Sequence, residues 1–339
     1  MSNKLNGVAI IPTGYGCRFG GHAGFNPGIR LLAECSNNLI INPNAVNASD
    51  LNEMTPNCLY VEGSSIDRFL KGQINLKKTK TQNKILMVVN PPAIPDNINS
   101  MNAGIHTLGA KIEILPLNTP LYMKAMFNED GSAGGVHSGV DNLIEQIEDL
   151  EFDALAIQTP IDCDYEVAKN YWDKGGRSIN PWGAVERIVS KLIAEKINKP
   201  VAHAPIEDYN DDRLHNIYHT QIVEPQNAAE AISNTYTFCI LKGLNKAPKL
   251  ELDTSYRSDS ILSNKDIDFL VTPHGCWGEP HKACIENNIP LVVVDENTTC
   301  YSEGFTYPEV NGIIHVENYL ECAGLISCMS AGVDYKTVL

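Results

Sequence analysis

The feature that most constrains the fold of this chain is a series of ten short apolar runs, each closing near Pro, Gly, Asn or Asp and followed by a helical stretch. Several runs are apolar at every position, as strands are when helices cover both faces of a parallel sheet. The alternation predicts an α/β fold with doubly wound, mainly parallel sheets, helices on both faces and two lobes. The predicted strands are residues 8–11, 39–41, 59–61, 85–89, 112–115, 154–157, 201–203, 269–271, 291–294 and 313–316.

Helices are predicted between these strands, among them residues 140–150, 181–195, 227–242 and 317–331. Gly243 and Gly332 are predicted to end the last two. Asn180 before a proline predicts a capped helix start whose N–H groups bind an anion, with Trp182 as a stacking surface. The alternative is a helix cap beside a Trp of the core.

Two stretches are candidate boundaries between the lobes. The glycine-rich residues 130–139 are predicted to connect an N-terminal lobe, residues 1–130, to a C-terminal lobe, residues 140–339, with a mobile lid as the alternative interpretation of this stretch. The polar residues 72–83 are the alternative boundary.

A glycine-rich loop follows the first predicted strand and precedes a helix that begins near Pro27. Glycines let backbone N–H groups approach a phosphate or carboxylate, and the helix start adds a positive dipole end. The spacing matches neither G-x-G-x-x-G nor a P-loop, and no acid follows the second strand, so NAD and FAD are disfavoured. Simple turn geometry is the alternative to the anion site that we predict at Thr13, Gly14, Gly16, Gly20 and Gly21.

Charge and hydropathy narrow the class of protein. The 339 residues carry a formal net charge of −15. No apolar run approaches the roughly 20 residues of a membrane helix, and no signal-peptide pattern opens the chain. We therefore expect a cytoplasmic protein that binds no nucleic acid, whose backbone demands a basic surface, and no membrane. A chain of this size and class is expected to form a homo-oligomer.

Ten cysteines occur without any C-x-x-C spacing, which disfavours a zinc knuckle. Most lie in apolar patterns, where free cysteine behaves as a small hydrophobic residue. An iron–sulfur cluster assembled from distant cysteines stays open as an alternative.

Polar residues follow eight of the predicted strands, at the sheet edge where α/β proteins place their sites. So many polar strand ends predict a site for a small anionic molecule rather than a set of turn residues. Candidate anion-binding residues outside the glycine-rich loop are Asn44, Arg68, Asn180, Trp182, Asp295 and Glu296.

Glu62 and His203 are candidate acid–base residues, because both lie at the ends of predicted strands. Arg68 would then clamp a carboxylate or phosphate. In the structural alternative, Asp67 caps its helix, Arg68 forms a surface pair and His203 is a satisfied core residue.

Cys276 is the best candidate nucleophile, because it lies between a strand and a helix start, where the pKa of a thiol is lowered. Cys163 is placed similarly, and two such cysteines are typical of cofactor-independent racemases. His274 is a further catalytic candidate. Together with Cys276, the residues His274, His281 and Asp295 form an alternative set of metal ligands.

Motifs along nearly the whole chain carry a resemblance to a known family. They include P-T-G-x-G at 12–16, G-G-x-A-G at 20–24, N-P-N-x-x-N-A at 42–48, Y-V-E-G at 60–63, N-P-W-G at 180–183, A-H-x-P at 202–205 and G-C-x-G at 275–278. With these motifs the chain resembles the family known as domain of unknown function 3326. The resemblance supports the α/β fold and names no reaction. His274 and Phe25 stand where the family has acidic residues, so chemistry that uses those acids would differ here.

Together these features predict an enzyme that acts on a small metabolite carrying a phosphate or carboxylate, with the reaction class open among isomerase, lyase and transferase. One alternative is a metabolite-binding or regulatory module without turnover. Another is a cysteine-ligated metal or iron–sulfur enzyme. The cofactor is unspecified, and a metal is compatible with the residues.

Overall fold

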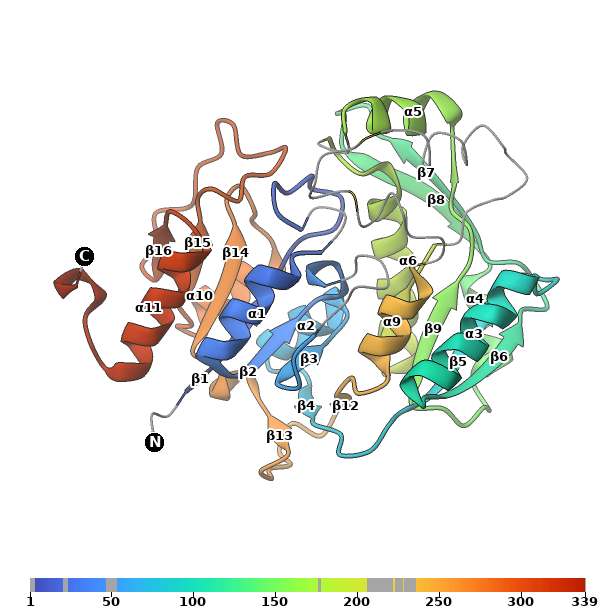
Figure 1. The fold of residues 1–339 in the computed structure, drawn as a ribbon, viewed down its shortest axis with the longest axis horizontal. Coiled ribbons are helices and arrows are strands. Elements are labelled where there is room, and N and C mark those ends of the chain that lie inside the picture. Colours follow the sequence, from blue (N-terminus) through green and yellow to red (C-terminus); the bar gives the residue numbers. More distant parts are fainter. Residues whose placement is uncertain are drawn as a thin grey trace.

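A computed structural model describes residues 4–20, 24–46, 54–175, 178–205 and 236–338, together with Ile222 and Ala228. In this part of the chain two sheets of parallel strands lie side by side, and each has helices on both faces (Figure 1). The predicted α/β class with doubly wound sheets is confirmed.

The first sheet has six strands, all parallel, in the order β16-β15-β14-β1-β2-β3. Helices α1 (Asn26–Cys35) and α11 (Tyr319–Ala331) cover one face, and helices α2 (Gly63–Leu70) and α10 (Glu279–Glu286) cover the other. Chain connections leave β1 and β14 toward opposite edges, so the sheet has its switch point between these two strands. The strands are β1 (Leu5–Ala9), β2 (Ser36–Ile41), β3 (Cys58–Tyr60), β14 (Phe269–Pro273), β15 (Leu291–Val294) and β16 (Ile313–Val316).

The second sheet has four parallel strands in the order β11-β9-β5-β6. Alternate residues of β5 face opposite layers: Met87 packs in the core with Ile240 of α9, and Val88 packs with Val185 of α6. The strands are β5 (Lys84–Val89), β6 (Lys111–Pro116), β9 (Ala154–Gln158) and β11 (Val201–His203). The covering helices are α3 (Pro95–Leu108), α4 (Val140–Ile147), α6 (Pro181–Ile197) and α9 (Thr237–Leu244).

Two small sheets complete the architecture. In one, the antiparallel hairpin β7–β8 packs on α6 and pairs with β10; in the other, β4 pairs with β12 and β13. Their bounds, with the remaining helix, are β7 (Tyr122–Phe127), β8 (Ala133–Ser138), β10 (Asp162–Cys163), β4 (Asn75–Lys77), β12 (Lys249–Glu251), β13 (Ile261–Leu262) and α5 (Tyr165–Asp173).

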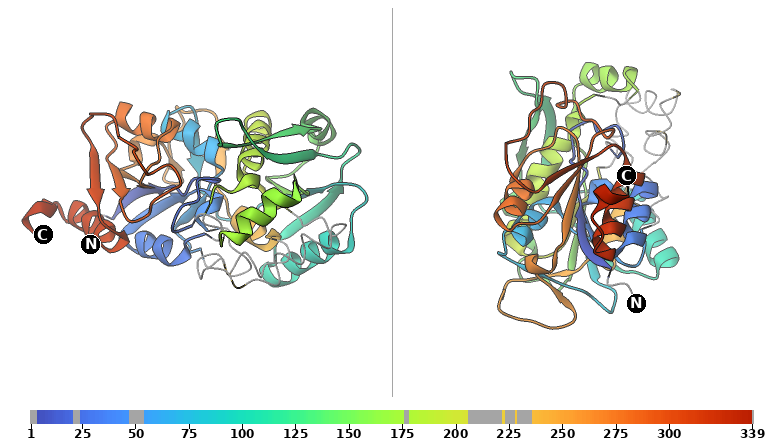
Figure 2. Two further views of the ribbon diagram at one scale, coloured as in Figure 1. Left: turned by 90° about the horizontal axis from the view of Figure 1, so that it is seen from above. Right: turned by 90° about the vertical axis from the view of Figure 1, so that its left-hand side faces the viewer.

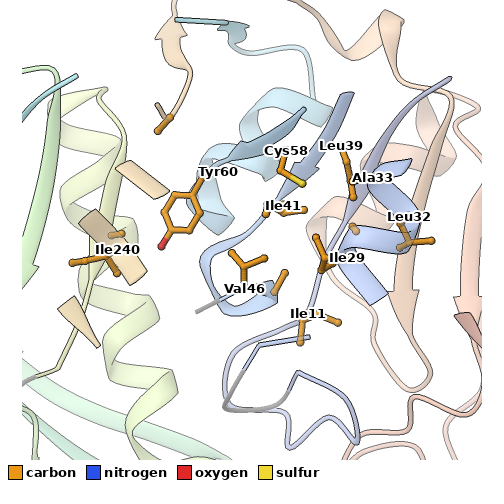
Figure 3. Close-up of a cluster of buried hydrophobic side chains, with 14 of the residues drawn as sticks. Ile11, Ile29, Leu32, Ala33, Leu39, Ile41, Val46, Cys58, Tyr60 and Ile240 are labelled. Atoms are coloured by element: carbon orange, nitrogen blue, oxygen red, sulfur yellow. The ribbon is translucent and has the colours of Figure 1, made fainter. Parts of the chain in front are cut away.

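One hydrophobic core crosses from the first sheet to the second. Ile29, Ile41 and Tyr60 belong to the same buried cluster as Met87 and Ile240. Figure 3 shows the Tyr60 ring on the side of this cluster that faces Ile240. The two sheets are therefore joined by packing as well as by chain connections, in the elongated body seen in Figure 1 and in the left view of Figure 2.

Each of the ten predicted strands is confirmed, and three of the four helices are found at or within two residues of their predicted starts. Of the fourth, residues 237–242 lie in α9, and most of the rest lies outside the described residues. Gly332 ends α11 in the left-handed conformation, as predicted. Gly243 does not end α9, which continues to Leu244; a Cβ at Gly243 would lie 2.6 Å from the Tyr60 ring, so close packing explains this glycine.

The sheet topology corrects the predicted lobes. Residues 133–138 form strand β8 rather than a connection, and the first sheet takes strands from both ends of the chain. The chain crosses to the second sheet at 78–83, inside the alternative boundary, and returns after α9. The two structural units are therefore formed by the described residues of 4–77 with 249–338, and by those of 84–244.

Candidate functional site

A cavity of about 350 Å³ lies between the two units, at the carboxyl ends of β1, β14 and β11. Its walls are the loop after β1, the first turns of α2 and α10, and one side of α6. It therefore opens at the switch point of the first sheet, where parallel α/β proteins place their ligands. The polar side chains and loop residues that line it include Thr13, Glu62, Asp67, Glu186, Arg187, Lys191, His203, Cys276 and His281.

Side-chain amides fix the glycine-rich loop on one wall. Asn42 accepts a hydrogen bond from Ile11 N–H at 2.9 Å and donates to its carbonyl at 2.8 Å, and Asn44 donates to the Gly20 carbonyl at 3.0 Å. Asn297 holds Phe19 through both its N–H and its carbonyl. The Nδ2 group predicted to bind an anion at Asn44 is thus occupied in holding the loop.

The loop packs directly on the start of α6. A Cβ at Gly183 would lie 2.6 Å from the Thr13 side chain and 2.9 Å from the Gly14 nitrogen, so this helix position requires glycine. Gly14, Gly16 and Gly20 all have positive φ, which supports the turn-geometry alternative. No hydrogen bond within the described residues uses the backbone N–H of Thr13 or Gly14, so an anion role for these two stays a prediction. Gly21 lies outside the described residues.

Glu62 caps helix α2. One carboxylate oxygen accepts from Ser64 N–H at 2.9 Å, and the other accepts from Ser65 N–H at 2.9 Å and from the Ser64 hydroxyl at 2.5 Å. Five per cent of the residue is exposed. These bonds satisfy N–H groups that a helix start leaves unpaired. The structure therefore favours a cap over the predicted general base.

Asp67 is one turn further along α2 and also lines the cavity. Burial, reinforced by the Glu62 carboxylate, raises its pKa from 3.8 to about 7. The structural alternative, in which Asp67 caps the helix, is wrong because Glu62 does so. Sequence reasoning missed Asp67 as a functional residue.

The position of Arg68 does not fit the predicted role of clamping a carboxylate or phosphate in the cavity. One guanidinium nitrogen donates to Asn198 Oδ1 at 2.9 Å, at the end of α6, and the residue is absent from the cavity wall. The cations on the wall are instead Arg187 and Lys191 of α6. They lie one turn apart, a helical spacing that could have indicated a shared basic face.

His203 is 3% exposed, and its Nε2 lies 3.2 Å from both the carbonyl and the hydroxyl of Thr159. Because the carbonyl can only accept, Nε2 carries the proton and Nδ1 has a free lone pair. Nδ1 has no hydrogen-bond partner within the described residues. Burial lowers the pKa of His203 to about 4, so the ring is neutral at pH 7. Since His203 lines the cavity, its unpaired Nδ1 is a candidate acceptor for a ligand there.

The environments of the two candidate cysteines differ from those predicted. Cys276 lines the cavity but is 2% exposed, and burial raises its pKa to about 12, which corrects the predicted activated thiolate. Cys163 lies on β10 outside the cavity wall, and its pKa is also raised to about 12 by burial. The two-cysteine racemase arrangement therefore has no support from the described residues.

Asn180 caps α6, as predicted. Its Oδ1 accepts from the N–H groups of Trp182 at 2.9 Å and Gly183 at 3.1 Å, so these donors are already satisfied. Trp182 packs edge-on against Tyr171, with ring centroids 5.5 Å apart. Both residues thus match the structural alternative rather than an anion site.

His274 and Asp295 lie beside a second, open hollow at the ends of β14 and β15. There they meet His315 of β16, which sequence reasoning did not select. His281 is not part of this group: its Nε2 pairs with the Thr272 hydroxyl at 3.0 Å and its Nδ1 accepts from Gly278 N–H. Glu296 lies on neither wall; its carbonyl accepts a long hydrogen bond from Arg18.

Two further findings concern the chain as a whole. None of the helices in the described parts combines the length and the apolar character needed to cross a membrane. The ten cysteines are all free thiols.

Comparison with known proteins adds a relative and a family. An uncharacterized lipoprotein of Synechococcus sp. is 28% identical over 350 residues, covering 98% of this chain and 93% of that protein. No solved structure matches. The family described as protein of unknown function (DUF3326) matches residues 6–339. The matched residues include both sheets, the residues that line the cavity and the glycine-rich loop. The chain therefore belongs to the DUF3326 family.

Proposed function

We propose that this protein is an enzyme that transfers a proton on a small anionic metabolite bound in the cavity between the two units. Asp67 carries the proposal, because it lines the cavity and its pKa is raised to about 7 by burial and by Glu62. A general acid–base group works best when its pKa lies near the operating pH. Isomerisation and elimination are the reactions that such a group serves.

The cations on α6 support an anionic substrate. Arg187 and Lys191 line the same cavity as Asp67, in a chain whose net charge is −15. Among the described residues Lys191 has one ion pair, a 3.8 Å contact with Glu195 in which both side chains are nearly half exposed, and such pairs are weak. Lys191 can therefore exchange this contact for a phosphate or carboxylate. The backbone N–H groups of Thr13 and Gly14 are candidate further donors.

His203 supports a substrate that carries a hydroxyl group. Its Nδ1 is a buried acceptor without a partner in the described residues. Leaving such a group unpaired costs about 1–3 kcal/mol, which a bound hydroxyl would recover. With a pKa of about 4, His203 is too weak a base to share the role of Asp67. We assign it to orientation of the substrate.

The test has two steps. A panel of phosphorylated and carboxylated hydroxy metabolites is screened for ligands by thermal shift, and each ligand is then incubated with the protein in D₂O while proton NMR follows deuterium uptake at carbon. We expect Asp67→Asn to lower the exchange rate by about 100-fold or more and to leave affinity within about threefold. Arg187→Met with Lys191→Met should instead lose affinity.

Asp259→Asn, on an exposed turn that does not line the cavity, is the matched control and should behave as wild type. Deuterium uptake that Asp67→Asn leaves unchanged would remove Asp67 from the chemistry. Ligands that bind tightly and never exchange would favour the alternative, a metabolite-binding module without turnover.

We also propose a cytoplasmic location, which follows from the sequence expectation above. The name of the Synechococcus relative, an uncharacterized lipoprotein, favours a membrane-attached location instead. Fractionation of cells that express the full chain distinguishes the two: recovery in the membrane pellet after a high-salt wash would contradict the proposal.

A further inference from the structure

The carboxyl ends of three neighbouring strands bring two imidazoles and a carboxylate together at the hollow beside the cavity. His274 follows β14, Asp295 follows β15, and His315 lies in β16. The chain order of these strands is also their order in the sheet, so the three residues share one edge. Across residues 4–20, 24–46, 54–175, 178–205 and 236–338, no other group of three His, Cys, Asp or Glu side chains has all its ligand atoms within 4.8 Å.

The distances within the group match a coordination shell. Asp295 Oδ1 lies 3.3 Å from His274 Nδ1 and 2.8 Å from His315 Nδ1. With metal–ligand bonds of about 2.0–2.2 Å, neighbouring ligands at right angles lie about 3 Å apart. His274 Nδ1 is itself buried and makes no hydrogen bond within the described residues, so binding an ion there would break none.

The surroundings hold the imidazoles and leave room for an ion. The Tyr307 ring stands edge-on to both, with centroids 5.8 Å from His274 and 5.4 Å from His315. Its hydroxyl accepts from Gly275 N–H at 3.1 Å, which ties the ring to the backbone beside His274. On the open side, His315 and Asp295 are 43% and 44% exposed, and Glu303 lines the same hollow.

From this arrangement we propose that His274, Asp295 and His315 bind one divalent transition-metal ion, of the class of zinc, iron(II), manganese(II) or cobalt(II). Two imidazoles and one carboxylate are a donor set typical of these ions, and the three protein ligands leave positions open toward the hollow. The site contains no thiolate, unlike the cysteine-ligated centre weighed from the sequence. It is independent of the acid–base function proposed for the cavity.

The test is metal binding by the full chain after treatment with a chelator. Zinc(II) is titrated by calorimetry, and cobalt(II) is titrated by electronic absorption. We expect one ion per chain, a cobalt spectrum without thiolate charge transfer, and at least a tenfold loss of zinc affinity in His315→Ala and in Asp295→Asn. His106→Ala, which removes an exposed imidazole of α3, should bind as wild type.

Both test residues are substantially exposed, so their variants are expected to fold, and circular dichroism and thermal melting check this. Zinc affinity that is equal in wild type and in a folded His315→Ala with Asp295→Asn double variant would overturn the proposal. So would a cobalt spectrum with thiolate charge transfer, since the ion would then sit on cysteines. Absence of zinc binding by wild type would reduce the group to a hydrogen-bonded His–Asp–His cluster.

Discussion

At the scale of single residues, Asp67 makes the free energy of unfolding of this protein depend on pH. Its pKa rises from 3.8 in the unfolded chain to about 7 in the fold, so between these values the folded state holds a proton that the unfolded chain has released. The group's contribution to stability is therefore present at low pH and is lost as pH rises through about 7. We expect wild type to lose roughly 2 kcal/mol relative to Asp67→Asn between about pH 5 and pH 8, measured by urea denaturation.

Two further variants serve as a test of the Glu62 charge and as a control for that measurement. Glu62→Gln removes the charge that most raises the pKa of Asp67, so the loss of stability should be smaller and should be complete at a lower pH. Asp259→Asn, on an exposed turn, should run parallel to wild type at every pH. A constant difference between wild type and Asp67→Asn across this range would mean that Asp67 does not titrate there.

Sequence reasoning found the position of several site residues but not their roles. Glu62, His203 and Cys276 do line one cavity: Glu62 and Cys276 follow strands of the first sheet, and His203 ends β11 of the second. Glu62 and Asp67 carry the same chemical group five residues apart, and only the start of α2 at Gly63 makes the first a cap. Burial, which sets the pKa values of Cys276 and His203, depends on packing that no local pattern contains.

At the scale of elements, the Asn180 cap stabilises the start of α6, the helix that supplies Arg187 and Lys191. Asn180 Oδ1 accepts from two N–H groups at the helix start. We expect Asn180→Ala to lower the free energy of unfolding by about 1 kcal/mol and Asn180→Asp, whose carboxylate can accept the same bonds, to stay close to wild type. Guanidinium denaturation measures both.

Asn318, which caps α11 away from the cavity in the same way, is the matched position. Asn318→Ala should cost a similar free energy but leave ligand affinity unchanged, whereas Asn180→Ala should weaken ligand binding as well. If Asn180→Asp loses as much stability as Asn180→Ala, the side chain does not act as a cap.

The predicted strands are confirmed in the two large parallel sheets, where apolar runs alternate with helices, and the strands of the small sheets were missed. Strands of three residues or fewer in the small sheets, such as β4 and β13, carry no periodic signal. Strand β8 was interpreted as a connection because glycine is rare in strands. Its Gly135 is needed for packing: a Cβ there would lie 2.5 Å from Val185 of α6.

At the scale of the whole molecule, chain order is a poor guide to which strands share a sheet. Strand β1 pairs with β14, about 260 residues later, and Asn6 N–H donates to Asp268 at 2.8 Å where they meet. The first sheet is thus closed by contacts that no local pattern specifies. The cavity between the units likewise depends on contacts between distant parts of the chain. For this reason its α6 cations, Arg187 and Lys191, were not predicted.

The two chain crossings between the units run together, and Asn83 ties them. This residue is 1% exposed; its Nδ2 donates to the carbonyls of Leu244 at 2.8 Å and Ala247 at 2.9 Å, and its N–H donates to the Asn245 carbonyl. Asn83→Ala removes a donor from two buried carbonyls, of which that of Leu244 keeps only a 3.3 Å bond from Ala247 N–H, so we expect a loss of about 2–3 kcal/mol in the free energy of unfolding. Urea denaturation measures this loss.

Thr81→Ala, on an exposed residue of the same crossing, should stay within about 0.5 kcal/mol of wild type. A loss confined to Asn83→Ala would show that the side-chain bonds, rather than the crossing's own conformation, hold the outgoing and returning chains together. Because the cavity lies between the units that these chains join, the same variant should also weaken binding of any ligand that contacts both α6 and the loop after β1. Unchanged affinity in a destabilised Asn83→Ala would instead mean that the shared core around Tyr60 fixes the two units without help from the crossings.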